Sequence, residues 1–149
     1  MSKYDCLKLE NQLCFPLYAC SKAITKKYKP FLDEFDLTYT QYITMMVLWD
    51  KKELTLKELG ECLYLDSGTL TPLIKKLEAK GYAVKRRSET DERNIFISVT
   101  DKGMALRDEI IKVPDAMGRC IQLSEDEASE LYRLLYKIIG ELEIKNGGD

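Results

Sequence analysis

Cysteine and tyrosine side chains are the groups in this chain best suited to do chemistry, because its 149 residues include no histidine. The absence of histidine excludes Ser-His and Cys-His catalysis and imidazole metal sites. The five cysteines are Cys6, Cys14, Cys20, Cys62 and Cys120. They form no CxxC pair, so the usual zinc spacing is missing, and their odd number argues against a structural disulfide set. We therefore expect no metal and no cofactor, and either packed thiols or one reactive thiol.

The composition predicts a helical protein of the cytoplasm. Hydrophobic residues make up 45% of the chain, enough for the core of one domain, and charged residues make up 32%. No apolar run approaches the roughly 20 residues of a membrane span, and the N-terminus lacks a signal-peptide core. We expect no membrane association.

A helix-turn-helix pattern followed by a β-hairpin occupies the middle of the chain, from Thr55 to Thr100. Thr55 and Glu58 have the spacing of a capping box, which predicts the start of the first helix. Asp66 is a suitable N-cap for the second helix, and Gly81 suits a left-handed helix end. The runs 82–87 and 95–99 are typical of paired strands around a polar tip at 88–94.

The hairpin and the second helix together suit a DNA duplex. Ser67, Thr69 and Thr71 lie on the first turns of that helix, which can enter the major groove, and Arg93 at the hairpin tip can probe the minor groove. The net charge is only −2, but it is segregated. Residues 75–93 hold seven cations against four anions, whereas residues 124–143 hold two against six. A local DNA-binding face on an acidic body would have this pattern, as would ordinary solvated helices.

Long helical patterns flank this centre. Residues 7–35 predict a helix of about 40 Å, bent near Pro16, which is too long for one small domain to cover. After the hairpin we expect a helix from Thr100 or Asp101 to about Val113, ended by Pro114, and a last helix opened by a Ser124–Glu127 capping box. The predicted fold is mostly α with a small β-hairpin wing. Residues 1–36 and 101–149 would form dimerisation helices, and 37–100 a winged helix-turn-helix lobe.

The whole chain resembles the MarR-type winged-helix regulators and, among them, the organic-hydroperoxide-sensing repressors (OhrR type). The resemblance rests on NQLCF at 11–15, LTYTQY at 37–42, LYLDSGTLTPLIKKLE at 63–78 and DER at 91–93. The combination of NQLCF with Tyr28 and Tyr39 discriminates best.

The resemblance implies a homodimeric repressor of operator DNA that is switched by oxidation of Cys14. Tyrosines matching Tyr28 and Tyr39 come from the other subunit and hydrogen-bond the sulfur, and Tyr18 is a third candidate. The geometry agrees, because on one helix Cys14 and Tyr28 would be about 21 Å apart and could meet only between antiparallel helices of two subunits. The organic hydroperoxide would convert the thiolate to sulfenic acid. Periodicity alone favours a different interpretation, because a cysteine on an apolar helical face is usually a small packed hydrophobe.

Two fates of the oxidised sulfur stay open. The resemblance makes Cys120 a candidate resolving cysteine, which would form an intersubunit disulfide with Cys14. Relatives without such a residue form a mixed disulfide with a small thiol, or overoxidise.

For DNA, the resemblance places Ser67, Thr69 and Thr71 in or beside the major groove and Arg93 in the minor groove, with Asp91 orienting it. From charge and position alone, we expect phosphate contacts from Lys75, Arg86 and Arg87, although a basic run is also common on a solvated strand edge.

Two other functions remain compatible with the sequence. A small aromatic ligand between the lobes could release DNA in place of oxidation, as in other MarR proteins. A thiol peroxidase using Cys14 would need a recycling CxxC and a thioredoxin-like βαβ order, and the sequence has neither. We therefore expect a regulator and not an enzyme.

Overall fold

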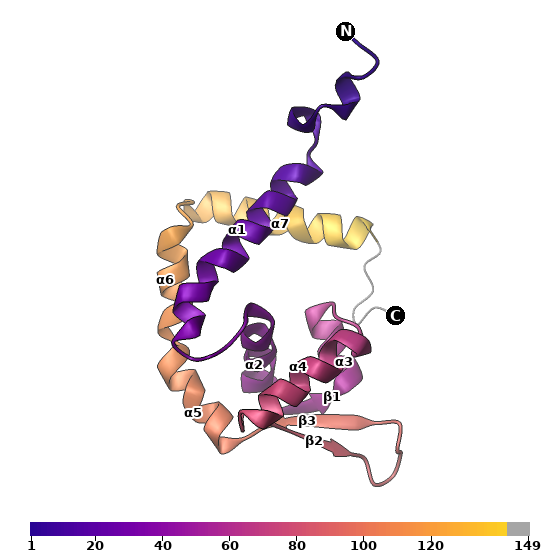
Figure 1. Ribbon diagram of the computed structural model, residues 1–149, viewed down its shortest axis with the longest axis vertical. Coiled ribbons are helices and arrows are strands. Elements are labelled where there is room, and N and C mark those ends of the chain that lie inside the picture. Colours follow the sequence, from indigo (N-terminus) through magenta and orange to yellow (C-terminus); the bar gives the residue numbers. More distant parts are fainter. Residues whose placement is uncertain (143–149) are drawn as a thin grey trace. The chain divides into compact units, whose positions relative to one another are not determined.

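The computed structural model describes residues 1–142. Two 3-10 turns, Asp5–Leu7 and Leu9–Asn11, precede the first α-helix. The other elements are α1 (Cys14–Asp33), α2 (Tyr39–Lys51), β1 (Glu53–Thr55), α3 (Leu56–Leu63), α4 (Ser67–Ala79), β2 (Ala83–Arg87), β3 (Ile95–Val99), α5 (Asp101–Ile110), α6 (Lys112–Cys120) and α7 (Glu125–Glu141) (Figure 1). The chain divides into two compact units, Met1–Tyr39 and the residues from Thr40 onward.

The first unit corrects the prediction of one helix over residues 7–35. The α-helix begins only at Cys14, and 3-10 turns replace its expected first part. Side chains capture backbone carbonyls there: Asn11 Nδ2 donates to Asp5 O at 2.7 Å, and Gln12 Nε2 donates to Cys6 O at 2.6 Å. These local bonds compete with helical ones. α1 is therefore about 30 Å long, not 40 Å.

Pro16 does not bend α1 in the way the sequence pattern predicts. With the helix starting at Cys14, Pro16 is its third residue. The first backbone N–H groups of a helix have no partner within it, so a proline here removes no helical hydrogen bond.

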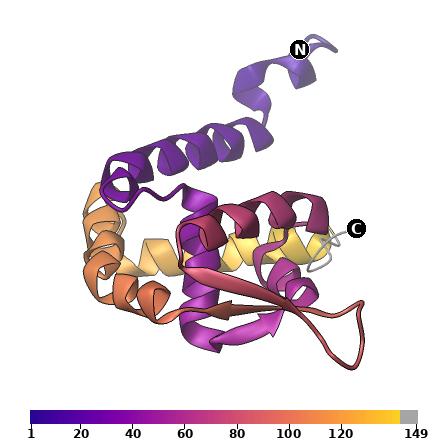
Figure 2. The same ribbon diagram turned by 60° about the horizontal axis from the view of Figure 1, so that its bottom comes forward.

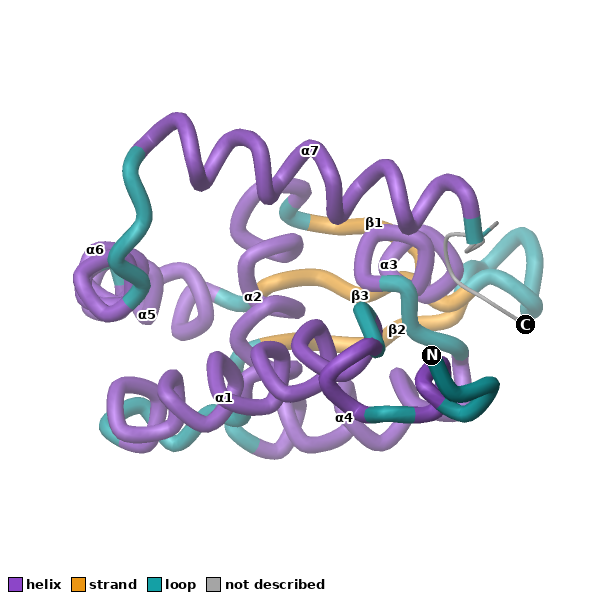
Figure 3. The backbone as a smooth tube through the Cα atoms, turned by 90° about the horizontal axis from the view of Figure 1, so that it is seen from above, coloured by secondary structure: helices purple, strands orange, loops and turns teal. Residues whose placement is uncertain are grey.

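The second unit contains a three-stranded antiparallel sheet in the order β1-β3-β2 (Figure 3). β2 pairs with β3 from Ala83↔Val99 to Arg87↔Ile95, which confirms the predicted wing hairpin. The polar tip, residues 88–94, extends past the paired strands (Figure 2). The sequence pattern missed β1, which pairs with β3 from Glu53↔Ser98 to Thr55↔Phe96.

Predicted helix boundaries in this unit mostly agree with the structure. The capping boxes Thr55–Glu58 and Ser124–Glu127 are both formed. Thr100 caps α5, and Gly81 has a φ of +82° just after α4. The break between α5 and α6 falls at Ile111, before Pro114. A proline leaves the carbonyl four residues earlier without its helical hydrogen bond, and for Pro114 that residue is Ile110, the last of α5. The predicted interruption is therefore present, a few residues before the proline.

Helices α3 and α4 pack over the sheet through a common core. Leu59, Leu70, Ile74, Leu77 and Ile97 are each 1% exposed or less. Burying side chains of this size supplies roughly 1.5–3 kcal/mol each. The helix-turn-helix and the wing are thereby fixed to one another as a lobe, here called the winged lobe (residues 53–99).

Within residues 1–142, every helix is too short or too polar to span a lipid bilayer. The last seven residues of the predicted C-terminal dimerisation segment, 143–149, lie outside the described residues.

Candidate functional site

Cys14 occupies the first position of α1. Its side chain is exposed, so the structure does not support the packed-hydrophobe interpretation within one protomer. Leu13, the N-cap, makes no side-chain capping bond. The positive end of a helix dipole favours negative charge at this position. A solvent-accessible thiol at a helix N-terminus is the environment in which reactive thiolates are found.

Tyr28 and Tyr39 form an aromatic pair in the same unit. Their ring centroids are 4.9 Å apart, with the planes at 44°. Burial, and then the neighbouring Tyr39, raise the pKa of Tyr28 above its ordinary value of 10.0. The Tyr28 phenol therefore stays protonated at neutral pH and is able to donate a hydrogen bond to an anionic acceptor.

The tyrosine pair does not reach Cys14 within one protomer. Both Cys14 and Tyr28 lie on α1, fourteen residues apart, which corresponds to about 21 Å. Tyr18 lies one turn from Cys14 and is 60% exposed, with the Lys22 ammonium 5.2 Å from its ring centroid. One protomer thus presents the thiol near one end of α1 and the phenol pair near the other.

Cys120 is the last residue of α6, in the second unit, and its side chain is exposed. Cys6, Cys20 and Cys62 are exposed as well. Among residues 1–142, no group of three His, Cys, Asp or Glu side chains is arranged to hold a metal ion.

The expected recognition helix is α4. Asp66 caps it, with Oδ1 accepting from the Thr69 backbone N–H at 2.7 Å. This backbone bond, above all, lowers the pKa of Asp66 below its ordinary value. The carboxylate is thus held in the helix cap, so its contribution to a DNA interface is to fix the helix start. Ser67, Thr69 and Thr71 are exposed, and the Thr71 hydroxyl donates to Ser67 O at 2.8 Å.

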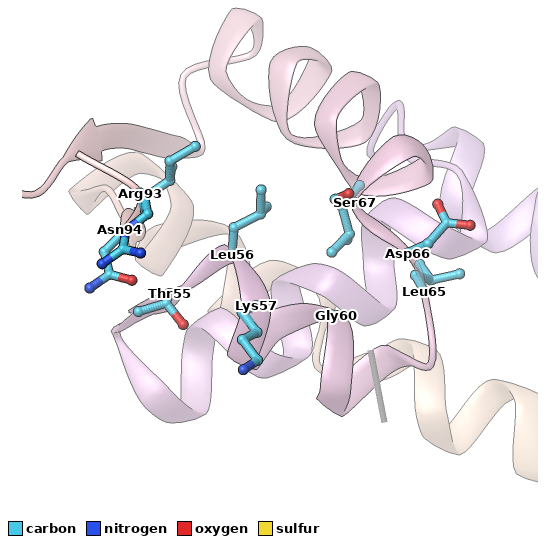
Figure 4. Close-up of a pocket in the computed structure, with 11 residues that line it drawn as sticks. Thr55, Leu56, Lys57, Gly60, Leu65, Asp66, Ser67, Arg93 and Asn94 are labelled. Carbon is cyan, nitrogen blue, oxygen red and sulfur yellow. The ribbon is translucent and has the colours of Figure 1, made fainter. Parts of the chain in front are cut away.

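An open cleft of about 360 Å³ joins the start of α4 to the wing tip. Its lining comes from the end of β1, from α3, from the start of α4 with the turn before it, and from the start of β3 with the residues just before it. Figure 4 shows Arg93 and Asn94 at one end, Asp66 at the other, and Lys57 between them. The structure therefore brings Asp66, Ser67 and Arg93 to one surface, as the sequence pattern predicts.

Lys57 and Asn94 are two residues of this surface that the sequence analysis missed. Their proximity to Thr55 and Arg93 in the sequence was the available signal.

The wing tip is organised by Asp91. Its Oδ1 accepts from the Arg93 backbone N–H at 3.0 Å and from Arg93 Nε at 3.2 Å. These bonds to Arg93, the side-chain one foremost, lower the pKa of Asp91. The Arg93 side chain is 91% exposed beyond this contact. Asp91 thus constrains an arginine that otherwise extends into solvent, which is the arrangement predicted for a minor-groove probe.

The three cations predicted to contact phosphates differ in how free they are. Arg86 Nη2 lies 3.0 Å from Glu53 Oε1, and its guanidinium stacks 4.7 Å from the centroid of the Phe96 ring. Arg87 Nη1 donates to Glu92 O at 3.0 Å. Lys75 is exposed and makes no ion pair within the described part of the chain. Arg86 therefore links strands of the winged lobe. Of these three cations, Lys75 is the one without a partner among the described residues.

Sequence comparison identifies related regulators. Residues 26–110 match the family model "Transcriptional regulator SarA/Rot". The chain is 44% identical over 145 residues to the organic hydroperoxide resistance transcriptional regulator of Bacillus subtilis, covering 97% of this chain and 99% of that protein. It is 45% identical over 133 residues to the HTH-type transcriptional regulator SarZ of Staphylococcus aureus, covering 89% of this chain and 90% of SarZ.

Solved structures show the same fold. Reduced AbfR bound to DNA superposes with a TM-score of 0.79 at 31% identity, covering 95% of this chain and 99% of that one. The disulfide-formed AbfR gives a TM-score of 0.66 at the same 31% identity, over 92% of this chain and 96% of that one. AbfR comes from Staphylococcus epidermidis.

Proposed function

Because the chain belongs to the MarR-type winged-helix transcriptional regulators of the organic-hydroperoxide-sensing type, we propose that it is a homodimeric repressor switched by oxidation of Cys14. It binds operator DNA while the thiol is reduced and releases DNA once an organic hydroperoxide has oxidised it. The observation that carries this proposal is the exposed Cys14 at the N-terminus of α1, in a chain that also holds a Tyr28–Tyr39 ring pair.

The chemical step needs only the thiolate and the peroxide. Cys14 Sγ attacks the distal oxygen of ROOH, the O–O bond breaks, and the alkoxide takes a proton to leave as ROH. The sulfur becomes a sulfenic acid. A thiolate is the reacting species, so groups that favour its charge raise the rate. The helix N-terminus is one such group, and a phenol O–H is another.

A second subunit supplies the phenols. With α1 antiparallel to its partner copy, the Cys14 end of one helix meets the Tyr28 end of the other. The protomer has apolar surface for this purpose: Leu13 is 74% exposed and Phe15 is 42% exposed. α7 has no buried residue although its Leu131, Leu134 and Leu135 are apolar. Exposed apolar surface on this scale is typical of an oligomer interface. We assign the segments at both ends of the chain, residues 1–36 and 101–149, to the dimerisation region.

Oxidation alters the phenol contacts and thereby the spacing of the two lobes. The sulfenic acid condenses with a thiol, releasing water and forming a disulfide. The thiol is Cys120 of the partner chain or a small cellular thiol. In the winged lobe, base edges are contacted by Ser67, Thr69 and Thr71, and Arg93 enters the minor groove. Phosphates are contacted by Lys75 and Arg87. Arg86 and Asp91 stabilise the wing, and Asp66 fixes the start of the recognition helix.

The protein responds to peroxide stoichiometrically and is not an enzyme. It acts in the cytoplasm, beside the DNA that it reads. A dithiol reductant regenerates the Cys14 thiol, so a coupled assay with excess hydroperoxide is expected to give only slow turnover. Cys14-dependent turnover at a rate usual for an enzyme, about 1 per second or more, would contradict this part of the proposal.

Operator binding before and after one equivalent of cumene hydroperoxide tests the switch. The samples are the wild type, Cys14→Ser, and Cys20→Ser as a matched control, because Cys20 is an exposed thiol on the same helix. The wild type and Cys20→Ser are expected to release DNA, and Cys14→Ser to hold it. Release by Cys14→Ser would refute the assignment.

A non-reducing gel identifies the resolving thiol. A covalent dimer that forms in the wild type and disappears in Cys120→Ser assigns Cys120. If only monomer is seen, the mass of the oxidised chain tells whether a small thiol has been attached.

A further inference from the structure

A second cleft lies in the first unit, between α1 and the start of α2. Its volume is about 500 Å³, within the range of small-molecule sites. Leu32 and Leu37 form an apolar floor, and both are almost fully buried. The surface of the cleft is mainly apolar, so a ligand here must bury hydrocarbon.

A row of lysines forms the rim of this cleft. Lys22, Lys26 and Lys29 come from one face of α1, at i, i+4 and i+7. Like charges at these spacings repel one another, and an anion placed among them relieves that repulsion. We call this site the lysine-rimmed cleft.

The cleft contributes too few anions to neutralise the row. Asp33, the one acidic residue in its lining, is paired with Lys29, with the Lys29 Nζ 2.8 Å from Asp33 Oδ2. The Lys22 ammonium faces the Tyr18 ring instead of a carboxylate. Lys26 makes no ion pair with any residue from 1 to 142. Two positive charges therefore border an apolar cavity.

We propose that the lysine-rimmed cleft binds a medium-chain aliphatic carboxylate, with its acyl chain over Leu32 and Leu37 and its head group between Lys22 and Lys26. The apolar floor would contact the acyl chain of the ligand, and the lysines of the rim would pair with its carboxylate. Because Tyr39 both lines the cleft and packs on Tyr28, the ligand would lie beside the phenol pair. The inference does not depend on Cys14 being a sensor.

Calorimetric titration of decanoate into the full-length Cys14→Ser protein tests the proposal, because this variant cannot be oxidised at position 14. Decanoate is expected to bind. Acetate, which has the head group alone, and decyltrimethylammonium, which has a similar chain and the opposite charge, are expected not to bind. Binding of decyltrimethylammonium as tight as that of decanoate would overturn the proposal, and so would tight binding of acetate.

The lysines are tested in the same background. The double substitution Lys22→Gln/Lys26→Gln is expected to weaken decanoate binding by at least about tenfold, because two charge-assisted contacts are lost. Lys27→Gln is the matched control, since Lys27 is exposed on the same helix but does not line the cleft. Unchanged affinity in the double variant, or an equal loss in Lys27→Gln, would refute the assignment. Failure here leaves the Cys14 switch intact, because operator release is measured separately.

Discussion

Lys75 and Arg86 are both cations of the predicted DNA face, but the structure predicts that they contribute unequally to the salt dependence of operator binding. Lys75 is exposed and makes no ion pair among residues 1–142. Arg86 is paired with Glu53 at 3.0 Å and stacked on Phe96. A cation that neutralises a phosphate releases counterions from DNA, whereas one already neutralised by the protein releases few.

The magnitude follows from the number of phosphate contacts that each substitution removes. Each contact contributes about 0.9 to the slope of log K against log salt concentration. A dimer carries two copies of Lys75, so Lys75→Gln is expected to reduce the slope by about 1.8. Between about 50 and 200 mM salt, the wild type would then lose roughly twelvefold more affinity than the variant. Arg86→Gln is expected to change the slope by less than about half as much.

Fluorescence anisotropy with labelled operator DNA measures these slopes on the reduced protein. Lys137→Gln is a charge-matched control, because Lys137 lies on α7, away from the winged lobe in the sequence. Its slope should equal that of the wild type.

Two results would refute the reasoning. An unchanged slope in Lys75→Gln would mean that Lys75 contacts no phosphate. A reduction in Arg86→Gln equal to that in Lys75→Gln would mean that Arg86 leaves Glu53 when DNA binds.

Three further predictions concern the phenol pair, a tight packing point and a helix cap. Tyr28→Phe keeps the ring and removes the hydrogen-bond donor, so oxidation of Cys14 by cumene hydroperoxide should slow roughly tenfold or more. Trapping of the sulfenic acid measures this rate, and an unchanged rate would exclude a phenol–sulfur hydrogen bond. Gly103→Ala places a Cβ 2.4 Å from Tyr82 O, and such overpacking should cost about 1–3 kcal/mol, seen by calorimetry as a lower Tm; an equal Tm would show that the backbone yields. Bonds to Ser124 lower the pKa of Glu127 below its ordinary 4.5, so its stabilisation is full above that value and lost as the pH falls through the lowered pKa. Denaturant unfolding at a series of pH values should show a smaller acid loss in Glu127→Gln, and parallel curves would contradict the linkage.

Features with a short-range sequence signal were predicted correctly. The caps at Thr55, Asp66 and Ser124 depend on a side chain and a backbone N–H three residues away, so the pattern itself contains the interaction. The wing hairpin was likewise readable, because alternation and a polar tip occur within one stretch of chain. The reach of Arg93 to Asp91 spans only two residues.

Features set by competition or by distant partners were not predicted. The apolar repeat that includes Leu9, Leu13 and Leu17 continues through the N-terminal segment and favours a helix, but Asn11 and Gln12 bind carbonyls there and hold 3-10 turns. β1 is three residues long and exists because β3, some forty residues later, pairs with it. The ion pair of Arg86 has the same origin, since Glu53 lies 33 residues away.

The lysine-rimmed cleft was also invisible in the sequence. Its lysines recur at helical spacing, which ordinarily marks a solvated face. Only the folded unit shows that Leu32 and Leu37 lie beneath them.

Thr55 is at once the last residue of β1 and the N-cap of α3, so strand and helix share one residue with no linker between them. The wing, joined to β1 through β3, therefore cannot swing independently of the helix-turn-helix. Each protomer therefore contacts DNA through one rigid winged lobe, and a dimer carries two such lobes. Half-sites one helical turn apart have centres about 34–36 Å from one another. We therefore expect a signal arising at Cys14 to weaken binding by changing the distance between the two winged lobes, so that the contacts of one half-site are gained or lost together.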